Sequence, residues 1–343
     1  MRGIIGYGTY VPYYRLDRSK ITAAMGSGGG PGHRAVAGYD EDTTTMGVEA
    51  ARNALRGSSP IPSSIWFATA NPAYPDKTNA TAIQAALDLP QDTWAVDAGG
   101  SARSAEAAIL GASGTAGVSM AVISDLRTGN PTSNDESSGG DAAAALIFGD
   151  DDDAPVLAHA LGRAASTGEF LDRYRLPGEN SSRIWEERFG EQAYLALAQD
   201  AIERATKSAN VGIEDVDKVI IAGMHARAVR GLSKIAGDKL VDDLTGLLGN
   251  PGAAQLPLLV ASALDQAEPG ETILCVHLAD GAYASVVRTT DAIADYTPFA
   301  TVASQIEGGS DNLEYNLYLT WRGFLDREPP RRPDPDRPGA PPA

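Results

Sequence analysis

The chain has 343 residues, a formal net charge of −17 and one cysteine. A negative charge of this size excludes nucleic acid and anionic membrane surfaces as expected partners, because both are bound mainly through lysine and arginine. The single Cys275 excludes internal disulfides, and the four histidines leave no pair at zinc-ligand spacing, so we expect no metal site. With no run of about 18 apolar residues and no cleavable signal pattern, we expect a soluble, cytoplasmic protein.

The first half alternates predicted strands with predicted helices. The β-branched and aromatic run at 3–10 predicts a strand, and the glycine-rich residues 26–32 predict a flexible loop. Residues 40–56 begin with side chains that accept hydrogen bonds from free backbone N–H groups and continue with apolar residues at helical spacing, which predicts a helix. The other elements expected here are strands at 64–70, 94–96, 118–124 and 142–148 and helices at 80–89 and 101–112.

The second half repeats the alternation. The elements expected here are helices at 193–209 and 256–267 and strands at 218–222, 271–278 and 284–289. Strands alternating with helices predict mixed α/β layers, arranged as two comparable halves. From about Glu328 onward, proline and charged residues cannot form a packed element, which predicts a tail or linker. We therefore expect an N-terminal half at 1–165, a C-terminal half at 166–327 and a tail at 328–343.

Three segments carry a resemblance to a known family. They are GIIGYGTYVPYYRL at 3–16, GYDEDTTTMGVEAARNAL at 38–55 and YLTWRGFL at 318–325. The chain resembles archaeal and actinobacterial members of the hydroxymethylglutaryl-CoA synthase family, within the thiolase superfamily, from residue 1 to about 325. The resemblance implies an α/β thiolase fold with five layers, αβαβα, two pseudo-symmetric halves and an active site between them.

The two central catalytic side chains of that family are missing. Its members transfer an acyl group from CoA to a cysteine at a helix N-terminus, where the helix dipole favours the thiolate, and use a glutamate as general acid/base. The cysteine position falls on Ala102 in GGSARSAEAA, and the glutamate position falls on Ala70 at the end of WFATA. Since alanine can neither carry an acyl group nor move a proton, the covalent route is closed.

The residues that bind the thioester carbonyl in the family are retained. His225 in AGMHARAVRGLSK follows a predicted strand, as the family histidine does, and Asn250 in LLGNPGAAQLPLL matches the family asparagine. Each also has a purely structural interpretation. His225 suits a helix cap or a hydrogen-bonded core position, and Asn250 suits a turn before Pro251.

A basic cluster follows His225 in an otherwise acidic chain. Its members are Arg227, Arg230 and Lys234. In the family this segment lies along the CoA entrance, so the resemblance implies that the cluster binds the phosphates of CoA. A solvated helix face is the alternative.

The proton carrier of the reaction has several candidates. Asp280 in LADGAYA replaces a small residue of the family's glycine-rich loop and becomes a base if burial raises its pKa, although an Asp-Gly turn is the simpler interpretation. Tyr283 and Tyr74 are candidates to line the same cavity and donate protons.

Other reactive side chains are interpreted as structural. Ser101 precedes the vacant cysteine position, but GGSAR lacks the second glycine of a nucleophile elbow. Cys275 lies in an apolar strand and is expected to be a small core residue, and His277 faces the same side.

Two functions of different classes remain. In the first, the chain is an enzyme that acts on acyl-CoA thioesters by aldol or retro-aldol chemistry, with His225 and Asn250 holding the enolate and Asp280 or Tyr283 moving the hydroxyl proton. In the second, it is a non-catalytic subunit that binds acyl-CoA or supports an active partner.

The resemblance also implies partners. Thiolase-fold proteins usually form homodimers through the central strands, so a homodimer is expected. Relatives with the same WRG to EPPRRP transition continue into a zinc-ribbon and OB-fold domain, so we expect that module as a separate polypeptide partner.

Overall fold

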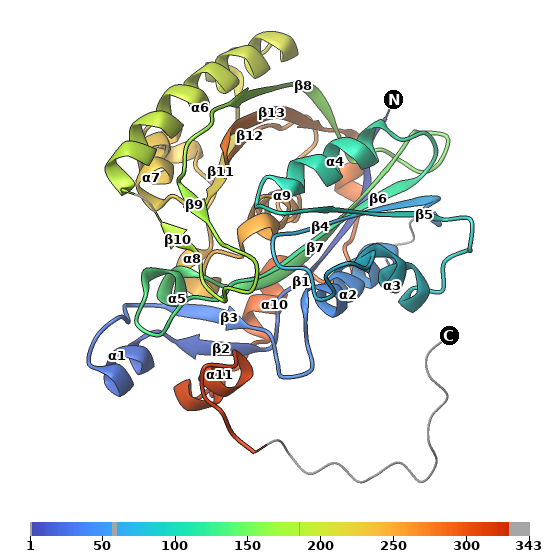
Figure 1. The fold of residues 1–343 in the computed structure, drawn as a ribbon. Helices are drawn as coiled ribbons and strands as arrows, with labels where there is room; N and C mark the ends of the chain where they lie inside the picture. The colour runs from blue at the N-terminus through green and yellow to red at the C-terminus, as the bar shows by residue number, and fades with distance from the viewer. Residues whose placement is uncertain (1, 57–59, 185, 329–343) are drawn as a thin grey trace, which may run out of the picture.

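The computed structural model describes residues 2–56, 60–184 and 186–328, so most of the predicted tail lies outside the described residues. Nine strands form the main sheet in the order β11-β12-β13-β8-β1-β7-β6-β4-β5 (Figure 1). Their bounds are β1 Gly3–Tyr10, β4 Ser64–Thr69, β5 Trp94–Gly99, β6 Ser119–Leu126, β7 Asp141–Gly149, β8 Ala158–Thr167, β11 Lys218–Gly223, β12 Thr272–Leu278 and β13 Gly281–Thr289. Every strand predicted from the sequence is confirmed within a few residues.

The strand order repeats. In β1-β7-β6-β4, the first two pairings are antiparallel and the third is parallel. The series β8-β13-β12-β11 has the same sequence of pairings. The two series meet at one residue pair, Ile4 with Ala158. The repeat therefore gives two pseudo-symmetric halves, and residue 165, the expected boundary, falls inside β8.

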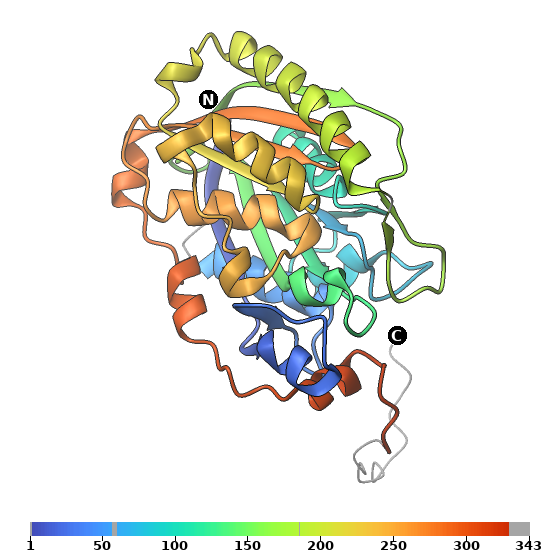
Figure 2. The ribbon, with the colours of Figure 1, turned by 90° about the vertical axis from the view of Figure 1, so that its left-hand side faces the viewer.

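Helices form three layers around the two halves of the sheet (Figures 1 and 2). Their bounds are α2 Thr43–Arg56 and α3 Asn79–Ala86 on one outer face, α6 Glu187–Ala209 and α7 Ala226–Ala236 on the other, and α4 Ser104–Gly114 and α9 Gln255–Leu264 between the halves. The alternation along β12 shows the layering, because Cys275 belongs to the central core while Leu274 and Val276 pack under α6 and α7. The expected five layers, αβαβα, are confirmed.

Several short elements were not predicted. They are β2 Tyr14–Asp17, α1 Ser19–Met25, β3 His33–Val36, α5 Asn134–Ser138, β9 Arg173–Tyr174, β10 Arg183–Ile184, α8 Thr245–Leu248, α10 Val302–Glu307 and α11 Tyr315–Trp321. Both ribbon views place α1, β2 and β3 beside α11 (Figures 1 and 2). They share an apolar cluster that includes Leu16, Ile21 and Tyr318. The N-terminal and C-terminal segments thus pack together.

Each half brings one strand unusually close to its outer helix. A Cβ on Gly8 of β1 would lie 2.2 Å from the backbone nitrogen of Ala54 in α2. A Cβ on Gly162 of β8 would lie 2.4 Å from the backbone nitrogen of Ala209 in α6. Backbone atoms cannot move aside as a flexible side chain does, so glycine is required at both equivalent positions.

We expect Gly162→Ala to lower the free energy of unfolding by about 1–3 kcal/mol, because the added methyl group overpacks the contact between β8 and α6. Denaturant titration checks this value. Gly114→Ala is the matched control, since a Cβ there meets nothing within 4 Å. An equal effect of both substitutions would contradict the close-packing argument.

Within residues 2–56, 60–184 and 186–328, no helix combines the length and the apolar character needed to cross a membrane.

Candidate functional site

A cavity of about 630 Å³ lies between the two halves. The strands β4, β5 and β6 are parallel to one another, so their carboxyl ends meet at one edge of the sheet, where α/β folds commonly bind ligands. Residues that follow each of these strands line the cavity, namely Ala70, Gly100 to Ala102, and Arg127. Ala70 and Ala102, the positions to which the resemblance assigns the family glutamate and cysteine, therefore lie in the wall of one cavity.

The hairpin formed by β9 and β10 covers this cavity and contributes most of the remaining wall. Figure 1 shows the hairpin between α6 and α7 on one side and α5 on the other. Ser101 also lines the cavity. Among the described residues, its hydroxyl makes no hydrogen bond to a histidine or a carboxylate, so the structure supplies no base for a serine nucleophile.

Three arginines line the cavity, and sequence analysis missed all of them. Arg127 lies 3.5 Å from Asp125, and Arg173 lies 2.5 Å from Asp135. Arg175 donates hydrogen bonds to the carbonyl oxygen of Ala70 at 2.9 Å and to Asn71 Oδ1 at 3.3 Å.

The three charges act on one another. Burial lowers the pKa of Arg127 below the usual arginine value, Asp125 opposes this shift, and Arg173 and Arg175 lower the pKa further. Burial raises the pKa of Asp125, although Arg127 opposes that shift. The arginines are close enough to repel one another, which favours the binding of an anion between them.

His225 lies directly beyond β11 and caps α7. Its Nδ1 accepts a hydrogen bond from the backbone N–H of Ala228 at 3.1 Å, so the proton of the neutral ring is on Nε2. The residue is 6% exposed, and Nε2 has no hydrogen-bond partner among the described residues. A buried N–H donor without a partner is a candidate to bind a ligand oxygen. The capping and the ligand-binding interpretations are therefore compatible.

His225 does not line the large cavity itself. It lines a much smaller cavity beside it, of about 20 Å³. The two cavities share Asp172, Arg173 and Met224 in their walls. A Cβ on Gly190 of α6 would lie 2.7 Å from His225 Nε2, so this glycine keeps the space in front of the nitrogen open.

Asn250 is placed as a turn residue. Its side-chain amide donates to the Gly223 carbonyl at 2.8 Å and to Gln255 Oε1 at 2.9 Å. Its Oδ1 accepts the backbone N–H of Gly252 at 2.9 Å. Both N–H groups thus have protein acceptors in this structure, and the pairing of Asn250 with His225 at a carbonyl stays a prediction.

Asp280 lines the large cavity but is exposed. It has a left-handed backbone conformation, with φ of 47°, in the turn between β12 and β13. The Asp-Gly turn interpretation is confirmed, and the side chain is not buried. Tyr283 does not line this cavity. It faces α4 in a separate groove, and burial raises its pKa to about 12. Tyr74 is exposed and does not line the cavity either.

A tyrosine that the sequence did not indicate lines the cavity. Tyr194 on α6 donates a hydrogen bond to Asp172 Oδ2 at 2.9 Å. Burial, and then the charge of Asp172, raise the pKa of Tyr194 well above the usual tyrosine value. Tyr194 therefore stays protonated and is a donor, not a base.

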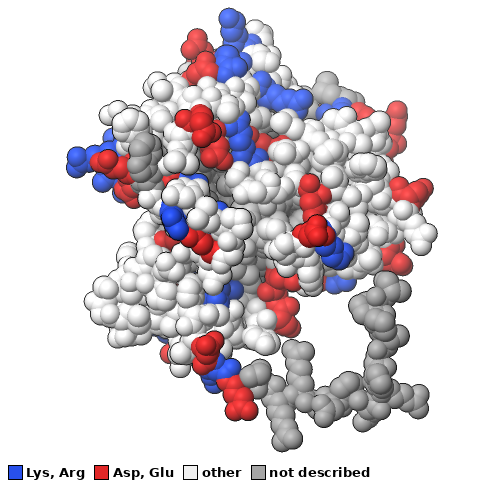
Figure 3. Space-filling model, viewed as in Figure 1, with Lys and Arg blue, Asp and Glu red and all other residues white. Residues whose placement is uncertain are grey.

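The basic cluster lies on the exposed face of α7. Arg227 pairs with Glu187 at 2.9 Å, while Arg230 and Lys234 are exposed. Charges of both signs are interspersed on the face of the molecule seen in Figure 3. The three residues thus lie on a solvated helix face, and their binding of CoA phosphates stays a prediction.

A buried carboxylate lies one helical turn from Ala102. Glu106, on the first turn of α4, lies 3.0 Å from His277 Nδ1 and 3.5 Å from Arg103. The prediction for His277 as a buried residue of the central layer holds, with Glu106 as its partner. Cys275 is buried in the central core as expected.

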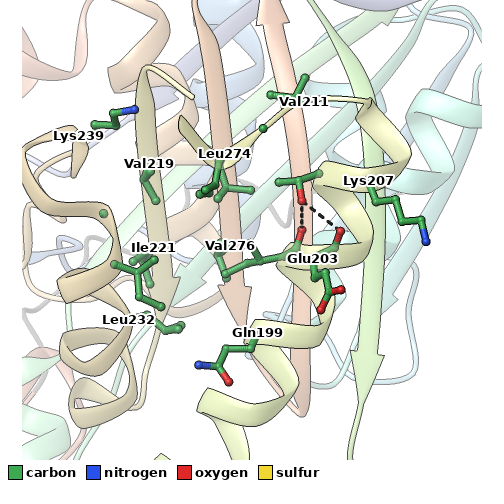
Figure 4. A pocket seen from close by; sticks show the side chains of 16 residues that line it. Gln199, Glu203, Lys207, Val211, Val219, Ile221, Leu232, Lys239, Leu274 and Val276 are labelled. Carbon is green, nitrogen blue, oxygen red and sulfur yellow. Dashed lines mark hydrogen bonds between the residues drawn. The ribbon is translucent and has the colours of Figure 1, made fainter. Parts of the chain in front are cut away.

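A second cavity, of about 530 Å³, lies between α6, α7 and the outer face of β11 and β12 (Figure 4). Its floor is apolar and includes Val219, Ile221 and Val276. It contains none of the predicted site residues. Among the described residues, no group of three or more His, Cys, Asp or Glu side chains is placed to hold a metal ion.

Comparison with known sequences gives full-length relatives. The chain is 31% identical to the hydroxymethylglutaryl-CoA synthase of Pyrococcus furiosus over 336 residues, which is 93% of this chain and 95% of the relative. It is 30% identical to the hydroxymethylglutaryl-CoA synthase of Aeropyrum pernix, covering 94% of each chain. No family model matches the sequence.

Solved structures agree on the fold. A HMG-CoA synthase complexed with CoA superposes with a TM-score of 0.76 at 16% identity, covering 92% of this chain and 89% of that one. The 3-oxoacyl-(acyl carrier protein) synthase III, FabH, of Pseudomonas aeruginosa superposes with a TM-score of 0.70 at 20% identity, covering 84% of this chain and 98% of that one. The thiolase fold expected from the sequence is confirmed.

Proposed function

Because the chain belongs to the hydroxymethylglutaryl-CoA synthase family, we propose that it binds an acyl-CoA thioester in the cavity between its halves and makes or breaks a carbon–carbon bond without an acyl-enzyme intermediate. One observation carries the proposal. The cavity is present and lined by charged groups, although Ala70 and Ala102 replace the two side chains of the covalent route. An aldol or retro-aldol reaction needs only a site for the enolate oxygen and a group to move the hydroxyl proton.

In the cleavage direction, the carboxylate of Asp280 takes the proton of the β-hydroxyl group. The Cα–Cβ bond then breaks, its electron pair moves into the thioester carbonyl, and the β-carbon leaves as an aldehyde or ketone. The Nε2–H of His225 donates to the enolate oxygen that forms. Protonation of the α-carbon by the acid form of Asp280 gives the shorter acyl-CoA and restores the carboxylate. Asp280 takes this part instead of Tyr283 because it lines the cavity.

The thioester reaches His225 only if the wall between the two cavities moves. Asp172, Arg173 and Met224 form that wall, and two of them belong to the segment that enters the β9–β10 hairpin. We assign the CoA phosphates to the exposed face of α7 with Arg227, Arg230 and Lys234, since this helix begins at His225. The substrate would then extend from α7 into the cavity.

The test of this function is incubation of the protein with a panel of 3-hydroxyacyl-CoA thioesters, followed by mass spectrometry. The expected result is a shorter acyl-CoA with one equivalent of an aldehyde or ketone, and no mass added to the protein. The reverse reaction is tested with acetyl-CoA and a panel of aldehydes. If the protein binds CoA but neither cleaves nor forms any of the thioesters, the enzymatic proposal is wrong.

A non-catalytic acyl-CoA-binding or scaffolding subunit is the alternative. The observation that favours it is the commitment of Asn250 to Gly223 and Gln255, added to the loss of both catalytic side chains. A calorimetric titration that detects CoA thioesters, together with the absence of turnover, would support this second function.

We also propose a homodimer. Strand β5 is at the end of the strand order, so among the described residues one of its edges has no neighbouring strand. Trp94 at its start is 63% exposed, and no residue of the strand is buried. An unpaired edge with little charge is a template for pairing with a second strand, and β5 of a second copy is the occupant we propose.

Trp94→Lys combined with Val96→Lys is expected to raise the dissociation constant of the dimer at least about tenfold, because like charges would face each other across the symmetric interface. Light scattering after size-exclusion chromatography measures this change. The control is a double lysine substitution at Gln199 and Glu203. Both residues lie on α6, which packs on β8 and β13, and these strands are distant from β5 in the sheet. A wild-type protein that is monomeric would contradict the proposal.

A zinc-ribbon and OB-fold polypeptide is proposed as a further partner. The proposal rests on the resemblance of the WRG to EPPRRP segment to relatives that carry this type of domain. Co-purification with affinity-tagged candidate proteins of that domain class tests it.

A further inference from the structure

A guanidinium group occupies the place next to the vacated glutamate position. Arg175 of the β9–β10 hairpin reaches across the cavity and donates to the carbonyl oxygen of Ala70 at 2.9 Å. It also donates to Asn71 Oδ1 at 3.3 Å. Where the family resemblance places a carboxylate, this chain therefore presents a cation. Beside Ala70, a positive side chain thus stands where the resemblance implies a negative one.

Arg175 differs from the other two cavity arginines in its partners. Arg127 pairs with Asp125, and Arg173 pairs with Asp135. Within the part of the chain that the structure describes, Arg175 forms no ion pair, and its hydrogen-bond acceptors are neutral. The charge of Arg175 also acts on Asp125, but Asp125 and Asp135 are only two carboxylates beside three arginines, which leaves a positive excess for a ligand.

The carboxylates in the cavity wall have other roles. Asp172 accepts the hydrogen bond of Tyr194 at 2.9 Å. Glu179 accepts the backbone N–H of Leu176 at 3.0 Å and pairs with Arg183 at 2.5 Å. Asp280 is exposed and is assigned to the proton step.

We propose that Arg175 binds a carboxylate carried by the acyl chain of the substrate, so that the cavity selects carboxylated acyl-CoA thioesters over apolar ones. The inference rests on the proposed function and adds the substrate class. Guanidinium groups suit carboxylates because two parallel N–H groups match two oxygens, and the neighbouring Arg127 and Arg173 add to the positive potential. The phosphates of CoA are not the expected anion, because the pantetheine arm separates them from the reacting end where Ala70 lies.

Isothermal titration with three probes tests the assignment. Glutaryl-CoA and pentanoyl-CoA have acyl chains of equal length and differ only in the terminal group, and free CoA carries the phosphates alone. The wild-type protein is expected to bind glutaryl-CoA at least about tenfold more tightly than pentanoyl-CoA, as for a charge-assisted contact worth about 1.4 kcal/mol. Arg175→Gln is expected to abolish that preference and to leave the affinity for CoA unchanged.

Two variants make the test specific. Arg183→Gln is the matched control, because Arg183 lies on the same hairpin but is exposed and pairs with Glu179. It should keep the preference. Arg175→Lys retains the charge and should retain part of the preference, and it serves if Arg175→Gln does not fold.

Three outcomes would overturn the inference. Equal affinity of the wild-type protein for glutaryl-CoA and pentanoyl-CoA removes the carboxylate subsite but leaves the proposed function intact. An equal loss of affinity for all three probes in Arg175→Gln means that Arg175 binds the phosphates instead. Failure of the wild-type protein to bind any thioester overturns the proposed function together with the subsite.

Discussion

Substitution of His225 by asparagine is expected to lower kcat for cleavage of a 3-hydroxyacyl-CoA by about 10²–10³-fold while leaving stability unchanged. The loss of one hydrogen-bond donor to a developing oxyanion has this size in other enzymes. Stability is kept because asparagine is among the best N-cap residues, and its Oδ1 is able to accept the N–H of Ala228 as Nδ1 does now. The substitution thus removes Nε2 without removing the cap.

The matched variant is His225→Ala, which removes both the cap and the donor. It should lose the same activity and, in addition, lower the free energy of unfolding by about 0.5–2 kcal/mol. Comparison of the two variants thus distinguishes the capping function of His225 from its function as a hydrogen-bond donor to the substrate. Full activity in His225→Asn with reduced stability in His225→Ala would leave His225 with a capping function alone.

The sequence predicts the main sheet well because its strands are apolar, short and bounded by turn residues. It does not predict β8, since AHALGRAAST contains four alanines and only one of the β-branched residues that mark strands, Thr167 at its end. The short α1, β2 and β3 are stabilised by packing against α11, almost 300 residues later in the chain. Local patterns do not contain such distant contacts.

The candidate site is predicted in part. Ala70, Ala102 and Asp280, which the resemblance assigns to the active site, line one cavity, and their roles there stay predictions. Arg175 was not predicted because it follows a strand of only two residues, β9, and reaches the cavity through a contact with Ala70, 105 residues away in the sequence. An arginine in a polar stretch usually indicates a solvated surface, and only the folded hairpin brings it over the cavity.

The same limit applies to Asn250. Its residue type and position fit the family asparagine, but the sequence does not show that Gln255 and Gly223 take both of its N–H groups. Residue identity predicts where a side chain lies more reliably than it predicts which partners that side chain has.

A fully buried carboxylate joins the C-terminal helix to the floor of the cavity. Asp141 accepts the backbone N–H groups of Arg127 at 2.9 Å and Ala37 at 2.8 Å. It also pairs with the side chains of Arg322 and Arg34, and neither Asp141 nor Arg34 has an exposed side chain. Since Arg322 directly follows α11, this one carboxylate holds α11, β3 and the start of the Arg127 loop together.

Replacement of Asp141 by alanine is expected to lower the free energy of unfolding by about 3–5 kcal/mol, because two buried guanidinium groups lose their counter-charge. Asp141→Asn keeps the volume and should still destabilise the protein, which separates the loss of charge from the loss of packing. Asp200→Ala is the control, as the Asp200–Arg204 pair is exposed and should contribute nothing measurable. Denaturant titration gives the free energies, and hydrogen exchange should show earlier opening of α11. An Asp141→Ala protein as stable as Asp200→Ala would mean that the buried arginines find water, and that α11 is held by the Leu16, Ile21 and Tyr318 cluster instead.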